Sequence, residues 1–173
     1  LTEALELDDL VGATLNNVGV ARVNKGDRSG LALVERSLAI GLERGSFEAV
    51  RAYVNLASLH QSLGDQRQAT ELHELALERA RQLGTGGYER WLECERVSDL
   101  FLAGRWVDAS AAAGQLLAVK HGTQYMDISL NEVRAWIAFA RGNVSGAFDE
   151  LQLAVDRARA IVEPQALLRT LAG

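Results

Sequence analysis

Four glycines recur at a nearly constant spacing along this chain of 173 residues. Gly26, Gly64, Gly104 and Gly142 are separated by 38, 40 and 38 residues. Each glycine follows one stretch with helical periodicity and precedes another, at a point where a helix ends with a positive φ that glycine adopts without strain. The spacing therefore predicts a repeated helix-turn-helix unit, and it favours an array of helix pairs over one globular core.

Apolar residues recur at intervals of three and four on both sides of these glycines, which is the periodicity of an amphipathic helix. Around Gly64 they are Val50, Tyr53, Val54, Ala57 and Leu63 before it, and Ala69, Leu72, Ala76 and Leu77 after it. The pattern predicts helix pairs at Asp9–Lys25 with Ser29–Arg44, Phe47–Leu63 with Gln66–Leu83, Tyr88–Ala103 with Val107–His121, and Gln124–Arg141 with Val144–Val162. No segment alternates with the period of a strand, so we predict an all-α fold. Asp27, Asp65 and Asn143 follow three of the glycines and are expected to cap the next helices.

The second repeat resembles the tetratricopeptide repeat (TPR). The resemblance rests on Ala52-Tyr53-Val54-Asn55-Leu56-Ala57, then Leu63-Gly64-Asp65, then Ala69, His73 and Ala76-Leu77. Small residues at 57, 69 and 76 let two helix axes approach closely, while the larger side chains fill the gap between them. The resemblance implies a right-handed superhelical array of antiparallel helix pairs in a single domain. Its repeats would lie at about residues 9–45, 46–84, 87–122 and 124–163, with a partial fifth repeat at 164–173.

Two departures from the family pattern affect the predicted packing. In the first repeat Leu31 and Leu38 occupy positions where small residues are expected, which widens that helix pair or shifts its register by one onto Ala32 and Ala39. The buried position of Leu56 is occupied by an arginine in each of the last two repeats, Arg96 and Arg134. A buried arginine needs a carboxylate partner. We expect those partners among Glu93, Glu95, Asp99, Asp127 and Glu132.

Composition excludes several classes of function. The chain carries 18 Lys and Arg against 23 Asp and Glu, for a net charge of -5, and no stretch concentrates basic residues as a nucleic-acid-binding surface would. No run of apolar residues is long enough to span a membrane. A single cysteine cannot form an internal disulfide, which favours a reducing compartment and a cytoplasmic location.

The phrase Leu100-Phe101-Leu102-Ala103-Gly104-Arg105-Trp106-Val107-Asp108-Ala109, together with long second helices, resembles the helical-repeat region of large bacterial LuxR-type transcriptional regulators and related signal-transduction ATPases. In that family the repeat region senses an inducer or a partner while restraining self-association. The sequence has no phosphate loop of the form GxxxxGK[ST] and no recognisable DNA-reading helix pair. The resemblance therefore implies a sensing or interaction segment, with ATPase and DNA-binding activities assigned to other parts of such a protein.

Both ends of the sequence favour a segment of a longer protein. Thr2-Glu3-Ala4-Leu5-Glu6-Leu7 is typical of the closing turns of a preceding second helix, and Pro164 with Leu167, Leu168 and Leu171 is typical of the start of a fifth repeat. Terminal repeats usually carry a polar outer face, and neither end does. We therefore expect exposed apolar terminal helices that could form a homodimer.

In repeat arrays of this family the first helices line a concave groove that accepts an extended peptide or a helix. Transferring these positions gives a polar N-terminal part and an aromatic C-terminal part. The candidate groove residues are Asn16, Val20, Asn24, Arg51, Val54, Ser58, Gln61, Trp91, Cys94, Ser98, Phe101, Glu132, Trp136 and Phe139. The tryptophans are either binding anchors or packing residues within the superhelix. The groove lacks the paired lysines and arginines of the family's peptide-carboxylate clamps.

The sequence favours a binding function over catalysis. Its three histidines, His60, His73 and His121, fall in different repeats without metal-ligand spacing, and no carboxylate pair has a companion base. We expect His60 to be packed or half-buried, and Cys94 to be a small packed residue. The predicted function is a non-catalytic interaction or inducer-sensing scaffold without metal or cofactor, whose partner is a protein, a peptide or another domain of the same parent chain. The alternative is a sensor with a small-molecule pocket between Trp91, Phe101 and Trp136.

Overall fold

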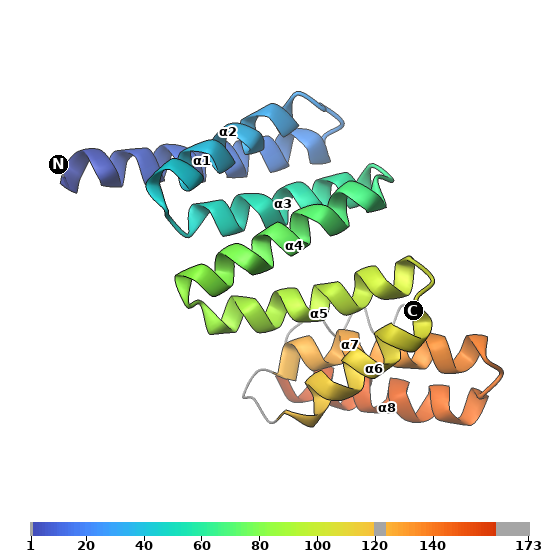
Figure 1. Ribbon diagram of the computed structural model, residues 1–173. Helices are drawn as coiled ribbons and strands as arrows, with labels where there is room; N and C mark the ends of the chain where they lie inside the picture. Colours follow the sequence, from blue (N-terminus) through green and yellow to red (C-terminus); the bar gives the residue numbers. More distant parts are fainter. Residues whose placement is uncertain (1, 120–123, 162–173) are drawn as a thin grey trace. The chain divides into compact units, whose positions relative to one another are not determined.

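The fold is known from a computed structural model that describes residues 2–119 and 124–161, and these residues form eight α-helices and no strand (Figure 1). The helices are α1 (Thr2–Asn24), α2 (Gly30–Arg44), α3 (Glu48–Ser62), α4 (Gln66–Leu83), α5 (Gly86–Leu102), α6 (Trp106–Ala118), α7 (Gln124–Ala140) and α8 (Val144–Ile161). The all-α prediction is confirmed, and in three of the predicted pairs the helices pack on each other: α1 with α2, α3 with α4, and α7 with α8. None of the described helices is long and apolar enough to cross a membrane.

The four recurring glycines form the joints within the helix pairs. Their φ angles are 90°, 85°, 75° and 77° for Gly26, Gly64, Gly104 and Gly142, so each lies in the left-handed region where a side chain would be strained. Two of the predicted caps are present: the Gln68 amide donates to Asp65 Oδ1 (3.2 Å), and the Gly146 amide donates to Asn143 Oδ1 (3.0 Å). These bonds satisfy backbone donors at the starts of α4 and α8.

Asp27 is not the N-cap residue that we predicted, because α2 begins at Gly30 and its N-cap residue is Ser29, two positions after Asp27. The Ser29 amide donates to Asp27 Oδ1 (3.0 Å), and the hydrogen bond from the Ser29 side chain, followed by this backbone bond, lowers the pKa of the Asp27 carboxyl. The contribution of this carboxylate to stability is therefore present above its ordinary pKa and is lost as the pH falls through its lower, folded-state value.

We expect Ser29→Ala to raise the pKa of Asp27 towards its ordinary value, because the hydroxyl donor is lost while the backbone donor stays. Carbon-detected NMR titration of the aspartate carboxyls measures this shift directly. An Asp27 titration curve that is the same in both proteins would contradict the assignment of the shift to Ser29.

The helices divide into two compact units, Leu1–Leu92 and Glu93–Gly173, with the boundary inside α5. In the first unit α1 packs on α2, α3 on α4, and α3 on both α1 and α2. The small residues predicted to allow this close packing, Ala57, Ala69 and Ala76, are fully buried. Leu56, Leu59 and Leu72 pack in the same core cluster as Ala57 and Ala69, and Ala76 packs with Leu77 in a second cluster.

The buried small residues of α2, Gly30 and Ser37, lie one position before Leu31 and Leu38, where the family pattern places small residues. Ala32 and Ala39 are exposed, whereas Gly30, Ser37 and Gly41 are buried, so the shift of register onto the two alanines was wrong. The contact between α1 and α2 explains the direction of the shift: a Cβ on Gly30 would lie 2.3 Å from the Gly19 carbonyl oxygen. Only two glycines allow the backbones to approach this closely.

In the second unit, α7 packs on α8 and on α6, and the buried face of α8 consists of alanines. Ala147, Ala154 and Ala158 are buried there, the last two against Ile128 of α7. The expectation that Arg96 and Arg134 occupy buried positions was wrong. Arg96 is exposed and Arg134 is half-buried, because the inward positions of these helices are the next residues, Val97 and Ala135.

The ends of the chain bear on two further expectations. Helix α1 runs without interruption from Thr2 to Asn24, so residues 2–7 do not form the end of a separate preceding helix. The expected partial fifth repeat at 164–173 lies outside the described residues, as does His121.

Candidate functional site

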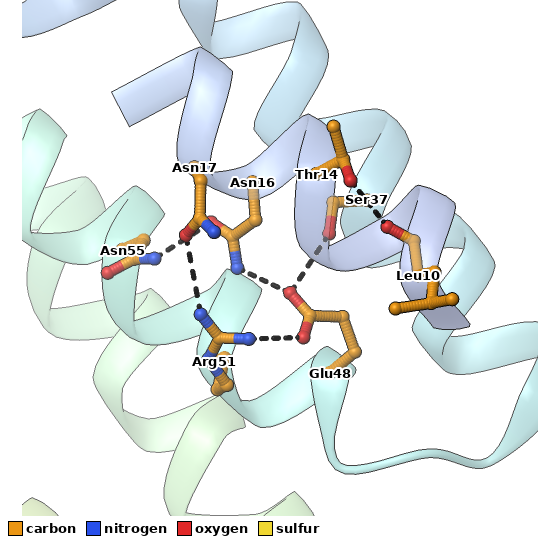
Figure 2. A network of polar contacts seen from close by, with 8 residues as sticks. All are labelled: Leu10, Thr14, Asn16, Asn17, Ser37, Glu48, Arg51 and Asn55. Atoms are coloured by element: carbon orange, nitrogen blue, oxygen red, sulfur yellow. Dashed lines mark hydrogen bonds and ion pairs between the residues drawn. The ribbon is translucent and has the colours of Figure 1, made fainter. Parts of the chain in front are cut away.

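Polar side chains from three helices of the first unit meet in one network (Figure 2). The carboxylate of Glu48 on α3 lies at its centre. The Asn16 side-chain amide on α1 donates to Glu48 Oε1 (2.7 Å), and the Ser37 hydroxyl on α2 donates to the same oxygen (3.4 Å). Asn16 and Ser37 are fully buried and Glu48 is 8% exposed, so the network joins the three helices inside the unit.

The network reaches the surface through three further side chains. Arg51 Nη1 donates to Glu48 Oε2 (2.8 Å), and Arg51 Nη2 donates to Asn17 Oδ1 (3.4 Å). The side-chain amide of Asn55 donates to Asn16 Oδ1 (2.8 Å). The Arg51 side chain is 35% exposed and Asn17 is exposed. The guanidinium and the amide therefore reach solvent while hydrogen bonds to the network hold them in place.

These contacts determine what the cluster can bind. The charges of Glu48 and Arg51 cancel, so the site does not attract anions strongly. A guanidinium has five N–H donors, of which the contacts to Glu48 and Asn17 use two. Neutral acceptors such as backbone carbonyls of an extended peptide fit this set of donors.

The structure brings two of the predicted groove residues, Asn16 and Arg51, into this network. Asn16 is fully buried, so it supports the surface and does not line it, contrary to the prediction. Ser58 and Gln61 are exposed on α3, and Asn24 is exposed on α1. The polar N-terminal part of the predicted groove is thus a first-helix polar face, which we define as Asn17 and Asn24 of α1 with Arg51, Asn55, Ser58 and Gln61 of α3.

The aromatic residues predicted for the C-terminal part lie in separate environments. Trp91 packs against the core of the first unit, beside Val50 and Leu92, and contacts the ring of Tyr88 edge to face at 6.2 Å. Phe101 stacks on Trp106 at 6.3 Å, and the Trp106 indole donates to the Phe101 carbonyl (3.2 Å), so Trp106 packs within its own repeat. The pocket between Trp91, Phe101 and Trp136 stays a prediction. Ser98 and Glu132 are half-buried in the second unit.

Trp136 and Phe139 are exposed on α7, with their rings in an edge-to-face contact at 6.5 Å. Together with Val144 and Phe148 of α8 they border a hollow of about 250 Å³. Every residue that lines it is apolar, the others being Ala135, Ala147 and Leu151. We call Trp136, Phe139, Val144, Phe148 and Leu151 the α7–α8 apolar face.

Sequence reasoning missed a second polar cluster, in the second unit. Asn131 on α7 is buried and donates to Glu150 Oε2 (2.5 Å), while Arg157 donates to Asn131 Oδ1. Arg134 Nη2 lies 2.6 Å from Glu150 Oε1, so its partner is on α8 and is not one of the carboxylates we expected. In both units a buried asparagine on a first helix thus contacts a glutamate that pairs with an arginine.

His60 and Cys94 lie in packed positions, as expected. His60 is half-buried and its Nδ1 lies 3.5 Å from Asp65 Oδ2, as expected for a packed position next to a joint. Cys94 is buried, in agreement with the prediction of a small packed residue. Among the described residues no group of three His, Cys, Asp or Glu side chains is placed to hold a metal ion.

Comparison with known proteins supports the fold. No protein-family model matches the sequence, and a search of curated proteins finds no match. Among solved structures the chain is similar to a Podosopora anserina protein described as a kinesin light chain with nearly identical TPR-like repeats, with a TM-score of 0.64, and to a variant of that protein, with a TM-score of 0.66. Each is 15% identical, over 94% of this chain and 82% of the other. The chain therefore has a TPR-like all-α fold.

Proposed function

We propose that this chain is a non-catalytic protein-interaction scaffold that binds an extended peptide segment along the first-helix polar face. The network around Glu48 is the observation that carries the proposal. It holds Arg51, Asn17 and Asn55 in fixed positions on two neighbouring first helices, and preorganised donors bind at a lower entropic cost than mobile ones. Arrays of helix pairs generally serve as interaction scaffolds, which supports the same proposal.

Arg51 provides the test, because its guanidinium is the strongest exposed donor of this face. Peptides selected from a random 12-residue library against the whole chain should bind Arg51→Ala about 10- to 100-fold more weakly, since a hydrogen bond from a charged group contributes about 1.5–3 kcal/mol. Fluorescence anisotropy of labelled peptides measures the change.

Arg67→Ala is the matched control. Arg67 is also an arginine paired with a glutamate on a helix, Glu71, but it lies on the second helix α4 and its side chain is 90% exposed. Peptide affinity should be unchanged in this variant. Equal weakening in both variants, or no selectable peptide, would contradict binding at the first-helix polar face.

We further propose that the scaffold is the partner- or inducer-sensing segment of a bacterial, cytoplasmic signalling or transcriptional regulator. The phrase from Leu100 to Ala109 at the joint between α5 and α6 supports this assignment through its resemblance to the repeat region of LuxR-type regulators. Sensing requires a ligand that binds two states of the array with different affinities. A phosphate loop encoded before Leu1, or a helix-turn-helix after Gly173, would support the assignment. Flanking sequence of an unrelated class would contradict it.

A further inference from the structure

Two apolar faces, one on α1 of the first unit and one on α7 and α8 of the second, have no partner among the described residues. One is a stripe on α1 formed by Leu10, Val11, Thr14, Val18 and Ala21, all exposed. We call it the α1 outer stripe. It lies on the side of α1 away from Gly12, Asn16, Gly19 and Val23, which are buried against the rest of the first unit. The other is the α7–α8 apolar face, where Phe148 is 69% exposed.

The repeat register indicates what kind of surface fits the α1 outer stripe. Helix α3 lies 38 residues after α1 in the repeat register, and its residues at the equivalent positions pack on α1 and α2. Val11, Thr14, Val18 and Ala21 correspond to Ala49, Ala52, Leu56 and Leu59, all of which are buried. The α1 outer stripe therefore occupies the positions by which a first helix packs on a preceding helix pair.

The same register identifies the α7–α8 apolar face as the complementary surface. Trp136 and Phe139 lie 116 residues after Val20 and Val23, which pack in the core cluster with Leu56 and Leu59 of α3. Between α2 and α8 the offset is one residue larger, because the buried small residues of α2 lie one position earlier than the family pattern predicts. Phe148 and Leu151 therefore correspond to Leu31 and Val34 of the same cluster. The α7–α8 apolar face is therefore the surface on which the next first helix packs.

Side-chain volumes indicate which helix fits this face. Where α3 packs on α1 and α2, large residues of α3, Leu56 and Leu59, meet smaller ones, Val20 and Val23. The equivalent residues of the α1 outer stripe are smaller, valine and alanine. Those of the α7–α8 apolar face are larger, tryptophan and phenylalanine. The total side-chain volume at the contact is therefore approximately the same when α1 is paired with α7 and α8, as close packing requires.

We propose that the α1 outer stripe of one copy of this chain packs on the α7–α8 apolar face of a second copy, in the way that α3 packs on α1 and α2. The two surfaces are different, so the contact is head-to-tail and each copy retains one unused face. Association of this kind continues beyond the dimer as concentration rises. The proposal extends the scaffold function to self-association, through residues other than those of the first-helix polar face.

Sedimentation velocity over a range of protein concentrations tests the proposal. The variants change exposed residues, so the core stays as it is in the wild type. Wild-type protein should show a weight-average mass that increases with concentration. Val18→Asp blocks the α1 outer stripe and Phe148→Asp blocks the α7–α8 apolar face, so each variant alone should be monomeric. An equimolar mixture should form a one-to-one dimer and nothing larger, because each variant retains the face that the other lacks.

Leu75→Asp is the matched control, since Leu75 is an exposed leucine on α4 outside both faces, and it should associate like the wild type. A wild-type monomer at all concentrations would overturn the proposal. Loss of association in Phe148→Asp alone would also overturn it, because that outcome indicates a symmetric pair or a different occupant of the α7–α8 apolar face. Peptide binding at Arg51 can be measured in Phe148→Asp, whose substitution lies in the second unit, so the scaffold function is tested separately.

Discussion

Glu48→Ala should lower the free energy of unfolding by about 3 kcal/mol, because removing one partner from a buried ionic network leaves the others unpaired. Asn16 would lose an acceptor in a fully buried position, and Arg51 would lose its carboxylate. For a chain of this size the thermal midpoint should fall by roughly 6–12 °C. Circular dichroism during heating measures the midpoint, and urea titration measures the free energy.

Two variants define the origin of this loss. Glu48→Gln keeps an acceptor for Asn16 and removes only the charge, so its loss should be smaller. Glu71→Ala removes an exposed glutamate paired with Arg67 on α4, and it should change the free energy of unfolding by less than about 1 kcal/mol. If Glu48→Ala were as stable as Glu71→Ala, the buried network would not hold α1, α2 and α3 together.

Gly30→Ala should destabilise the first unit by about 3 kcal/mol, at the upper end of the range for overpacking, because the obstacle is backbone. The added Cβ would lie 2.3 Å from the carbonyl oxygen of Gly19 and 2.9 Å from Val23 Cγ2. Neither α1 nor α2 can accept this methyl group without moving apart. Urea unfolding followed by circular dichroism measures the loss.

Gly114→Ala provides the matched control, because Gly114 lies inside α6 and an added Cβ would meet only Arg134 Nη1, at 3.7 Å. This substitution should be neutral or stabilise the protein by about 0.5–1 kcal/mol through helix propensity. A similar loss in both glycine variants would point to a general effect of alanine, and would contradict the close contact between Gly19 and Gly30.

The fold was largely predictable from sequence because its main signals are local. The recurring glycines fix where helices end, and the three- and four-residue spacing of apolar residues fixes their faces. Register was harder to predict. The pattern did not distinguish Gly30 and Ser37 from Ala32 and Ala39 as the packed positions of α2, since that choice depends on the backbone contact with Gly19. Arg96 and Arg134 were assigned to the buried side because the local pattern did not distinguish them from the next residues, Val97 and Ala135, which are the buried ones.

The candidate site was only partly predictable. Arg51 and Asn16 were singled out from their positions in the repeat, but their common partner Glu48 was not. A signal for it exists in the sequence: Glu48 falls on the same helical stripe as Ala52, Leu56 and Leu59, which are buried. A charged residue on an apolar stripe needs a partner from another helix. Which helix supplies it depends on tertiary packing, which a local pattern does not contain.

The most direct test of the scaffold function is the map of amide chemical shifts when a selected peptide is added to the isotope-labelled chain. Perturbations concentrated on the first-helix polar face, around Asn17 and Asn24 of α1 and Asn55 and Ser58 of α3, are the predicted result, and at the same peptide concentration they should be much smaller in Arg51→Ala. Perturbations confined to the second helices α2 and α4, or to the α7–α8 apolar face, would contradict it.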